Sequence, residues 1–190
     1  MKRLAVLLLA VSLASGCKST LRVNNQSDPK DFAPIDLPGG GYTGSAFAEL
    51  EYSVPEELSN EEFDIVRVDI FGDVFVEEIA AAGEMEIEID IYLGLEAGEE
   101  DLDDPEINTF LTTITISDPD ERHHVEISNP RLLEKGLRQG RFFIKVEAEI
   151  ITNPTTGSDP RLGVLRITDI YFNAFLERET SGLLAFLNMF

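Results

Sequence analysis

The stretch EMEIEIDIYLGLE, residues 84–96, decides the fold class because acidic and apolar residues alternate along it. The acids share one parity and the apolar residues share the other: Glu84, Glu86, Glu88 and Asp90 against Met85, Ile87, Ile89 and Ile91. A period of two is typical of a strand with one buried face and one solvated face. We therefore predict a strand whose isoleucines face a core and whose carboxylates face water.

The same period recurs along the rest of the chain. It predicts further strands over residues 46–54, 66–76, 110–116, 125–127 and 142–150. Gly72 interrupts the second of these and is expected at a bulge or a kink. Residues 163–177 are apolar on both parities in places, which indicates a central strand or one that bridges two sheets.

One short helix is expected near residues 130–139. Asn129 can cap it, Pro130 suits the first helical position, and Gly140 can end it. About seven antiparallel strands with short turns and one wet face then predict an all-β, antiparallel β-sandwich, immunoglobulin-like or jelly-roll-like. It forms a single domain over residues 42–190.

The N-terminus, MKRLAVLLLAVSLASGCKST, has the form of an export signal. Lys2 and Arg3 form a basic region, and residues 4–13 form an apolar region too short to span a bilayer. Such a segment is removed on export and is left out of fold reasoning.

Residues 13–17, LASGC, resemble the lipobox of bacterial lipoprotein signals, although Ala14 stands where that motif usually has Leu. The resemblance implies that residues 1–16 are cleaved off and that Cys17 carries a diacylglycerol and an N-acyl group such as palmitate. Several acyl chains together give stable membrane anchoring. Lys18 after the cysteine implies outer-membrane sorting in bacteria with two membranes. The alternative is an ordinary secretory signal with an incidental cysteine, but Cys17 is the only cysteine and cannot form an internal disulfide.

Residues 17–41 are predicted to be the lipidated cysteine and a flexible tether, because they are polar and broken by Pro and Gly. The formal net charge of the chain is −21. It excludes nucleic acid as a default partner and disfavours anionic lipid headgroups. A large acid excess with only five lysines suggests a halophile, and a merely acidic envelope protein is the alternative. Lys145 and Arg67 could offset the acidic strand if their strands neighbour it.

A calcium site is the better of two candidate chemistries. Carboxylates fill the loop EEDLDDPE at residues 99–106, with Glu99, Glu100, Asp101, Asp103, Asp104 and Glu106 as possible ligands. Hard oxygen ligands at this density suit Ca²⁺, although the loop lacks the glycine of an EF-hand. A second acidic loop, residues 55–62, is expected at the same end of the sandwich. The alternative is an acidic loop that is simply solvated.

Catalysis is the weaker candidate. His123 and His124 are the only histidines, and adjacent residues of a strand point to opposite faces. Ser128 or Ser117 could join His124 in a hydrolase site, but no nucleophile motif supports that arrangement. No Cys/His cluster suits zinc. We therefore expect a non-enzymatic protein without a cofactor, apart from the candidate Ca²⁺.

The sequence as a whole favours a lipid-anchored, exported cell-envelope β-sandwich with a structural or binding role. Its partners would be the membrane, through Cys17, and a protein or glycan of the envelope. The alternative is a Ca²⁺-dependent adhesion or binding module that uses loop 99–106. The apolar stretch SGLLAFLNMF, residues 181–190, either packs on the sandwich or forms a patch for a partner.

Overall fold

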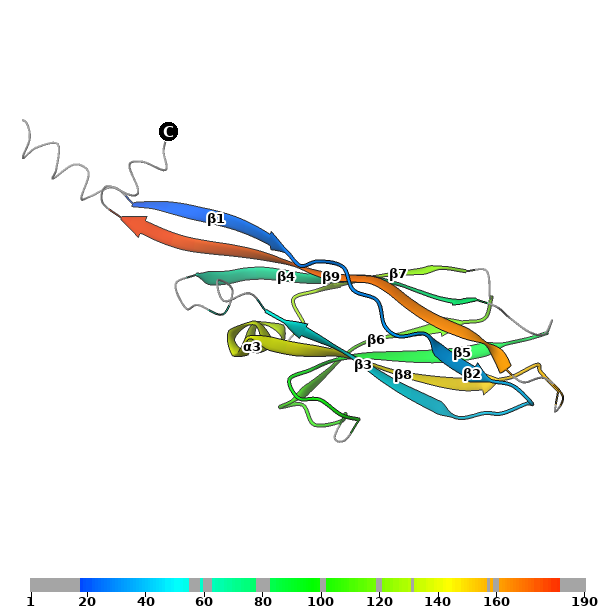
Figure 1. Cartoon of the computed structure of the whole chain (residues 1–190). Coiled ribbons are helices and arrows are strands. Elements are labelled where there is room, and N and C mark those ends of the chain that lie inside the picture. The colour runs from blue at the N-terminus through cyan, green and yellow to red at the C-terminus, as the bar shows by residue number, and fades with distance from the viewer. Residues whose placement is uncertain are drawn as a thin grey trace, which may run out of the picture.

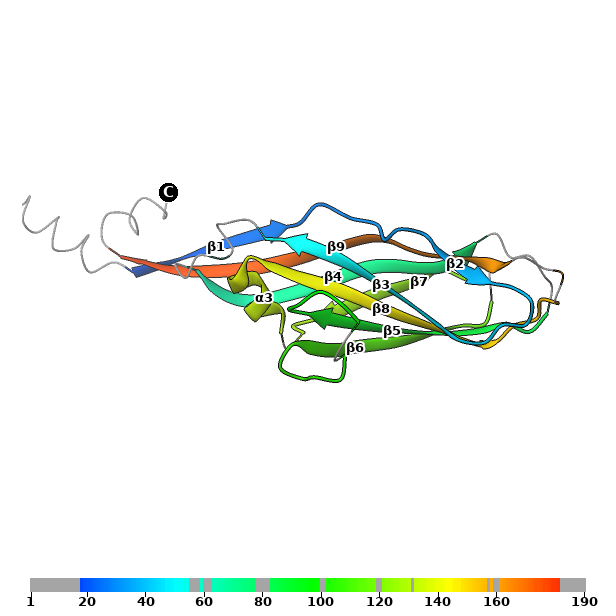
Figure 2. The same cartoon turned by 60° about the horizontal axis from the view of Figure 1, so that its bottom comes forward.

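The computed structural model describes residues 18–54, 59, 63–77, 83–99, 102–118, 121–130, 132–156, 158 and 161–181. Residues 1–17, which hold the predicted signal and Cys17, and residues 182–190 lie outside the described residues. Two antiparallel sheets pack face to face around one core (Figures 1 and 2). The expected all-β sandwich is thus confirmed. None of the helices in the described part of the chain has the length and apolar character to span a membrane.

The first sheet has the order β1-β9-β4-β7, with β2 also paired to β9. Its strands are β1 (Lys18–Gln26), β2 (Ile35–Pro38), β4 (Asp64–Glu77), β7 (His123–Ser128) and β9 (Arg161–Ser181). The second sheet has the order β3-β8-β5-β6. Its strands are β3 (Ser45–Ser53), β5 (Glu86–Gly94), β6 (Asn108–Ile116) and β8 (Arg141–Thr152).

The alternation in β5 places its side chains as expected. Ile87, Ile89 and Ile91 are buried between the sheets, and the acids on the other parity face outward. The facing strand β9 supplies buried Ile167, Ile170, Phe172 and other apolar side chains. The core therefore lies between the two sheets. In β5 it uses one parity of the strand, whereas in β9 the buried parity changes between Ile167 and Ile170, where the register with β4 shifts.

Tyr52 of β3 joins the two sheets through the core. Its hydroxyl donates a hydrogen bond to the backbone oxygen of Ile170 in β9. Its ring stacks on Phe142 at a centroid distance of 5.2 Å and meets the edge of Phe172 at 5.9 Å. Burial, with a smaller effect of the Asp31 carboxylate, raises the pKa of Tyr52, so the hydroxyl keeps its proton as a donor.

Strand β9 is central, as its apolar character predicts. It pairs with β1, β2 and β4. From Phe71 to Asp73, β4 advances two residues while β9 advances three, from Tyr171 to Thr168. The bulge expected at Gly72 therefore lies across from it, with the extra residue in β9. Beside this bulge, Asp169 has a φ of 53°, and its backbone N–H donates to the Asp31 carboxylate.

Residues 18–41 correct the tether prediction. Instead of a flexible segment, β1 and β2 add two strands to the first sheet, so the described strands number nine rather than seven and the domain begins at residue 18. The cause is tertiary, because the backbone of β1 pairs with residues 173–181 of β9. Leu37 of β2 and nearby Phe32 are buried in the core and hold this segment down.

The helix α3 (Leu133–Gln139) starts later than predicted. Asn129 does not cap it, because its backbone has a φ of 49° and its side-chain oxygen accepts from the Val68 backbone N–H. The helix has no side-chain cap at its N-terminus. Gly140 ends it in the left-handed conformation, as expected, and Leu133 and Leu137 are buried.

The outer ends of β1 and β9 form a two-stranded ribbon that extends from one end of the sandwich (Figure 1). Lys18, the first residue of β1, pairs with Ser181, the last residue of β9. The chain therefore enters and leaves the described domain at the same tip.

Candidate functional site

The outer face of the second sheet carries directly opposed carboxylates. Glu88 of β5 lies opposite Glu149 of β8, and Asp90 lies opposite Glu147. Like charges directly across a strand pair destabilise a sheet. Asp90 is partly held by a hydrogen bond from the Thr113 hydroxyl of β6. Repulsion between the carboxylates of this acidic face therefore lowers the stability of the fold, and fold geometry or screening ions must offset it.

Among the carboxylates of this face, Glu147 shows the clearest electrostatic effect of its neighbours. Partial burial raises the pKa of its carboxyl, and repulsion from Glu99, Asp90, Glu149 and Asp103 raises it further. Glu99 and Asp103 belong to the predicted calcium loop. The loop therefore lies close enough to β8 to act on Glu147 electrostatically.

Lys145, one of the two cations suggested for the acidic strand, lies on β8, which does neighbour β5. It lies opposite Tyr92 and Glu49 and is only 1% exposed. Burial lowers the pKa of its amine, and the nearby acids Glu49 and Glu96 oppose that shift. Gly94 provides the space for its stem.

Arg67, the other cation proposed for the acidic strand, lies in β4 of the first sheet and cannot offset it. Its guanidinium instead pairs with the buried Asp69 carboxylate at 2.7 Å. The cross-strand partners of β5 could not be read from the chain, because pairing is set by the order of strands in the sheet.

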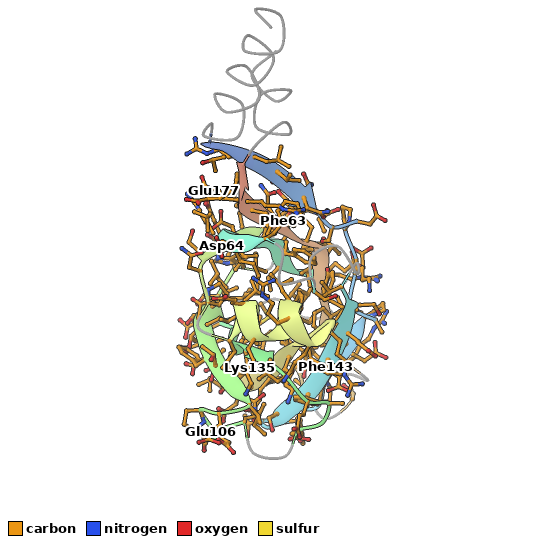
Figure 3. The ribbon with its side chains drawn as sticks, turned by 90° about the vertical axis from the view of Figure 1, so that its left-hand side faces the viewer. Phe63, Asp64, Glu106, Lys135, Phe143 and Glu177 are labelled. Carbon is orange, nitrogen blue, oxygen red and sulfur yellow. The ribbon has the colours of Figure 1, made fainter. Side chains whose placement is uncertain are left out.

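The predicted calcium ligands lie in the loop between β5 and β6. Glu100 and Asp101 are outside the described residues, whereas Glu99, Asp103, Asp104 and Glu106 are described. Asp104 stabilises its own turn, because its side chain accepts from the Glu106 backbone N–H. Figure 3 shows Glu106 at the opposite edge of the view from Glu177.

Within the described part of the chain, no three His, Cys, Asp or Glu residues form a group that could hold a metal ion. The calcium site stays a prediction, since two of its six candidate ligands fall outside that part. The acidic residues of the companion loop, Glu56, Glu57, Glu61 and Glu62, also lie outside it.

The outer face of the first sheet carries a feature that sequence reasoning missed. We call it the aromatic face, and it comprises Phe71, Asp73, Phe75, Arg122, His124 and Tyr171. Phe71 of β4 stacks on Tyr171 of β9 with centroids 4.9 Å apart and on His124 of β7 at 6.4 Å. The Arg122 guanidinium lies 4.3 Å from the Phe75 ring centroid.

Ion pairs cancel charge along this sheet. Asp73 accepts from His124 Nδ1 at 2.9 Å and pairs with Arg122 at 3.5 Å. Four further arginines have carboxylate partners along the sheet: Arg67 with Asp69, Arg166 with Glu77, Arg22 with Glu177, and Arg161 with Asp36. The aromatic face is therefore close to neutral within a strongly anionic chain.

The two histidines lie on opposite sides of β7, as predicted. His124 is exposed on the aromatic face, and His123 is half-buried toward the other side. Ser128 stands four residues from His124 on the same strand, a span of about 13 Å. This separation rules out the hydrolase arrangement of His124 with Ser128. Ser128 instead accepts a hydrogen bond from Arg67.

The aromatic face had a signal in the sequence. In residues 66–76 one parity is mostly apolar and predicts the side of the strand that faces the core. The other parity holds Phe71 and Phe75 besides charged residues. This pattern is the signal from which an outward aromatic surface could have been predicted.

No protein-family model matches the sequence, and no curated protein matches it. Among solved structures, the chain is similar to a carbohydrate-binding module of the β-sandwich superfamily, at 8% identity and a TM-score of 0.37. The match covers 78% of this chain, which spans only 55% of the length of that one.

Plant virus coat structures are also similar. Turnip yellow mosaic virus empty capsid matches at 12% identity and a TM-score of 0.33, over 86% of this chain and 82% of that one. The tobacco necrosis virus structure matches at 8% identity and a TM-score of 0.33, over 90% of this chain and 100% of that one. These likenesses concern the β-sandwich architecture alone.

Proposed function

We propose that this protein is a lipid-anchored, non-enzymatic protein of the cell envelope that binds a neutral saccharide on its aromatic face. The observation that carries the proposal is the stacked pair Phe71 and Tyr171, flanked by the ion-paired Asp73, Arg122 and His124. The export and anchoring rest on the LASGC sequence before Lys18.

The charge of the protein favours a neutral ligand on the aromatic face. An anionic ligand would be repelled by a chain of formal net charge −21, and a cation would favour the acidic face of the second sheet. A neutral ligand would be neither repelled by the net charge nor drawn to the acidic face. The arginines of the aromatic face are already paired with carboxylates.

Among neutral ligands, the side chains of the aromatic face favour a saccharide. A sugar ring has an apolar C–H face, which suits the half-buried rings of Phe71 and Tyr171, and a rim of hydroxyl groups. His124 and Arg122 have side chains that are 63% and 57% exposed, so they can hydrogen-bond those hydroxyls. Apolar surface with a few placed polar groups is the usual composition of a small-ligand site.

The test compares Tyr171→Ala with Phe110→Ala by native electrophoresis through gels cast with dextran, mannan, xyloglucan or β-glucan. Phe110 is a matched control, because it is an exposed aromatic on β6 of the other sheet. We expect at least one polysaccharide to retard the wild-type chain and the Phe110 variant, and Tyr171→Ala to lose at least tenfold in affinity. Thermal melts check that both variants fold.

Two outcomes would refute saccharide binding: no polysaccharide retards the wild-type chain, or Tyr171→Ala is retarded as strongly as the wild type. The anchor is tested separately by the mass of the N-terminal peptide of the mature chain from a lipoprotein-processing bacterium. We expect an acylated Cys17, and an unmodified Cys17 would refute anchoring.

A further inference from the structure

Strand β6 is an edge strand of the second sheet (Figure 2). Among the residues that the structure describes, β6 is hydrogen-bonded to β5 alone. A bulge at Leu111 interrupts this pairing, but residues 112–116, TTITI, match β5 one for one. The backbone groups of residues 112–116 that point away from β5 therefore have no partner strand within the described part of the chain. Such an edge is a template on which a further strand can pair.

The β6 edge differs in charge from the other edges of the two sheets. Natural edge strands are commonly protected against sheet extension by charged residues or proline. The other described edge strands all carry charged side chains: Lys18 and Arg22 in β1, Asp36 in β2, Glu49 and Glu51 in β3, and Glu126 in β7. Residues 108–116 of β6 contain no charged residue and no proline, in a chain that is 27% charged. The β6 edge is therefore the one that lacks this protection.

Strand β6 also borders an open side of the sandwich. A hollow of about 380 Å³ lies between β6 and β7, the edge strands of the two sheets. Polar and apolar side chains line it, and its apolar side chains are half-buried: Leu111, Ile114, Val125 and Ile127. A strand added at β6 would cover Ile114 and remove more of this apolar surface from water.

We propose that the strand added at β6 comes from a second copy of this chain, in an antiparallel dimer centred on Ile114. In this register Ile114 of each copy lies opposite Ile114 of the other, and Thr113 lies opposite Thr115. The pairing is self-complementary. Thr113 and Thr115 lie opposite acids of β5 on the outer face, whereas Ile114 packs against the core. Threonine would therefore meet threonine outside, a pair that stabilises antiparallel sheets, and isoleucine would meet isoleucine inside.

Charge favours β6 over the other edges as the contact between two anionic chains. Neighbouring strands of a sheet lie about 4.8 Å apart, so the acids of β5 would stand three strand spacings, about 14 Å, from those of the other copy. This distance exceeds the Debye length of about 8 Å at physiological ionic strength. Pairing through β3 would instead place Glu49 and Glu51 in the contact itself. The remaining repulsion between the two chains is screened by salt, so the dimer should strengthen as salt is added.

Sedimentation velocity tests the dimer on the chain that follows the predicted signal, residues 17–190. A reducing buffer prevents a disulfide between two Cys17 thiols. We expect a monomer–dimer equilibrium whose dissociation constant falls as KCl is raised. Ile114→Lys and Ile114→Glu should each raise that constant at least tenfold, because like charges would lie directly opposite. An equimolar mixture of the two variants should restore the dimer, because opposite charges would then face each other.

Ala48→Lys is the matched control, since Ala48 is half-buried on β3, the other edge of the same sheet. It should dimerise as the wild type does, and thermal melts check that each variant folds. Oxidation of Ile114→Cys in a Cys17→Ser chain is a second measurement. It should give a covalent dimer, because paired Cα atoms about 5 Å apart suit a disulfide, whereas Ala48→Cys should not.

Three outcomes would overturn the proposal. The wild-type chain stays monomeric at every salt concentration, Ala48→Lys weakens the dimer as much as the Ile114 variants do, or the mixture of oppositely charged variants stays monomeric. Dimer formation of this kind requires neither the saccharide site nor the lipid anchor, so its failure is distinct from theirs.

Discussion

The two outer faces of the sandwich treat charge in opposite ways. On the first sheet, arginines pair with carboxylates and surround stacked aromatic rings. On the second, Glu88 and Asp90 lie opposite Glu149 and Glu147. Both faces come from strands with the same period of two. The difference shows that alternation decides which residues face outward, whereas strand order decides which charges meet.

The first prediction concerns calcium and has the largest expected effect. A cation held by loop 99–106 would cancel charge beside the second face and so break the contrast. One site at a hundred times its Kd adds about 2.7 kcal/mol of stability. The hypothesis predicts a rise in Tm in CaCl₂ that KCl of equal ionic strength does not match. Glu99→Gln with Asp103→Asn should remove it, and equal rises in both salts would reject the site.

Gly94→Ala tests the buried cation at the edge of the acidic face. A Cβ at this position would lie 2.5 Å from Lys145 Cε and 2.8 Å from the Asn108 side-chain oxygen. We expect a loss of about 2 kcal/mol in urea unfolding, the usual cost of overpacking. In a Lys145→Ala background the same change should cost less. Equal costs in both backgrounds would show that Lys145 is not what Gly94 accommodates.

Glu147→Gln tests the repulsion on the acidic face. Because the folded pKa of Glu147 is raised, its ionised form destabilises the fold. Wild-type stability should therefore rise as pH falls from 7 through that folded pKa toward 4.5, the ordinary value. The variant should be more stable at pH 7 by about 0.5 kcal/mol and should lose this part of the pH dependence, with solvent screening keeping the gain small.

The matched control for that prediction is Glu126→Gln. Glu126 is an exposed acid on β7 of the first sheet, and its electrostatic neighbour is Arg67. Neutralising it should not stabilise the protein at low salt. If both variants raised Tm equally, net charge rather than the opposed pairs would explain the effect. The proposed difference between the two faces would then be rejected.

Local patterns predicted the sandwich well, because side-chain alternation is a property of each strand by itself. The isoleucines of β5, the irregularity beside Gly72 and the central position of β9 followed from neighbouring residues. The helix start was misjudged because the Asn129 side chain bonds to Val68, which is distant in sequence. The candidate site was missed because its aromatic pair joins β4 to β9.

The chain by itself determined most of the core, since burial of apolar side chains repeats with the period of the strand. The burial of Lys145 and the exposure of Val66 depended on the fold. The acid excess is likewise a property of the composition, and the export signal stays a prediction from residues 1–17. Only the tertiary structure decided the partners: β1 on β9, Lys18 beside Ser181, Asp90 against Glu147, and Phe71 on Tyr171. The physical reason is that strand pairing depends on backbone hydrogen bonds, which every residue offers alike, so side-chain pattern alone cannot choose among partners distant in sequence.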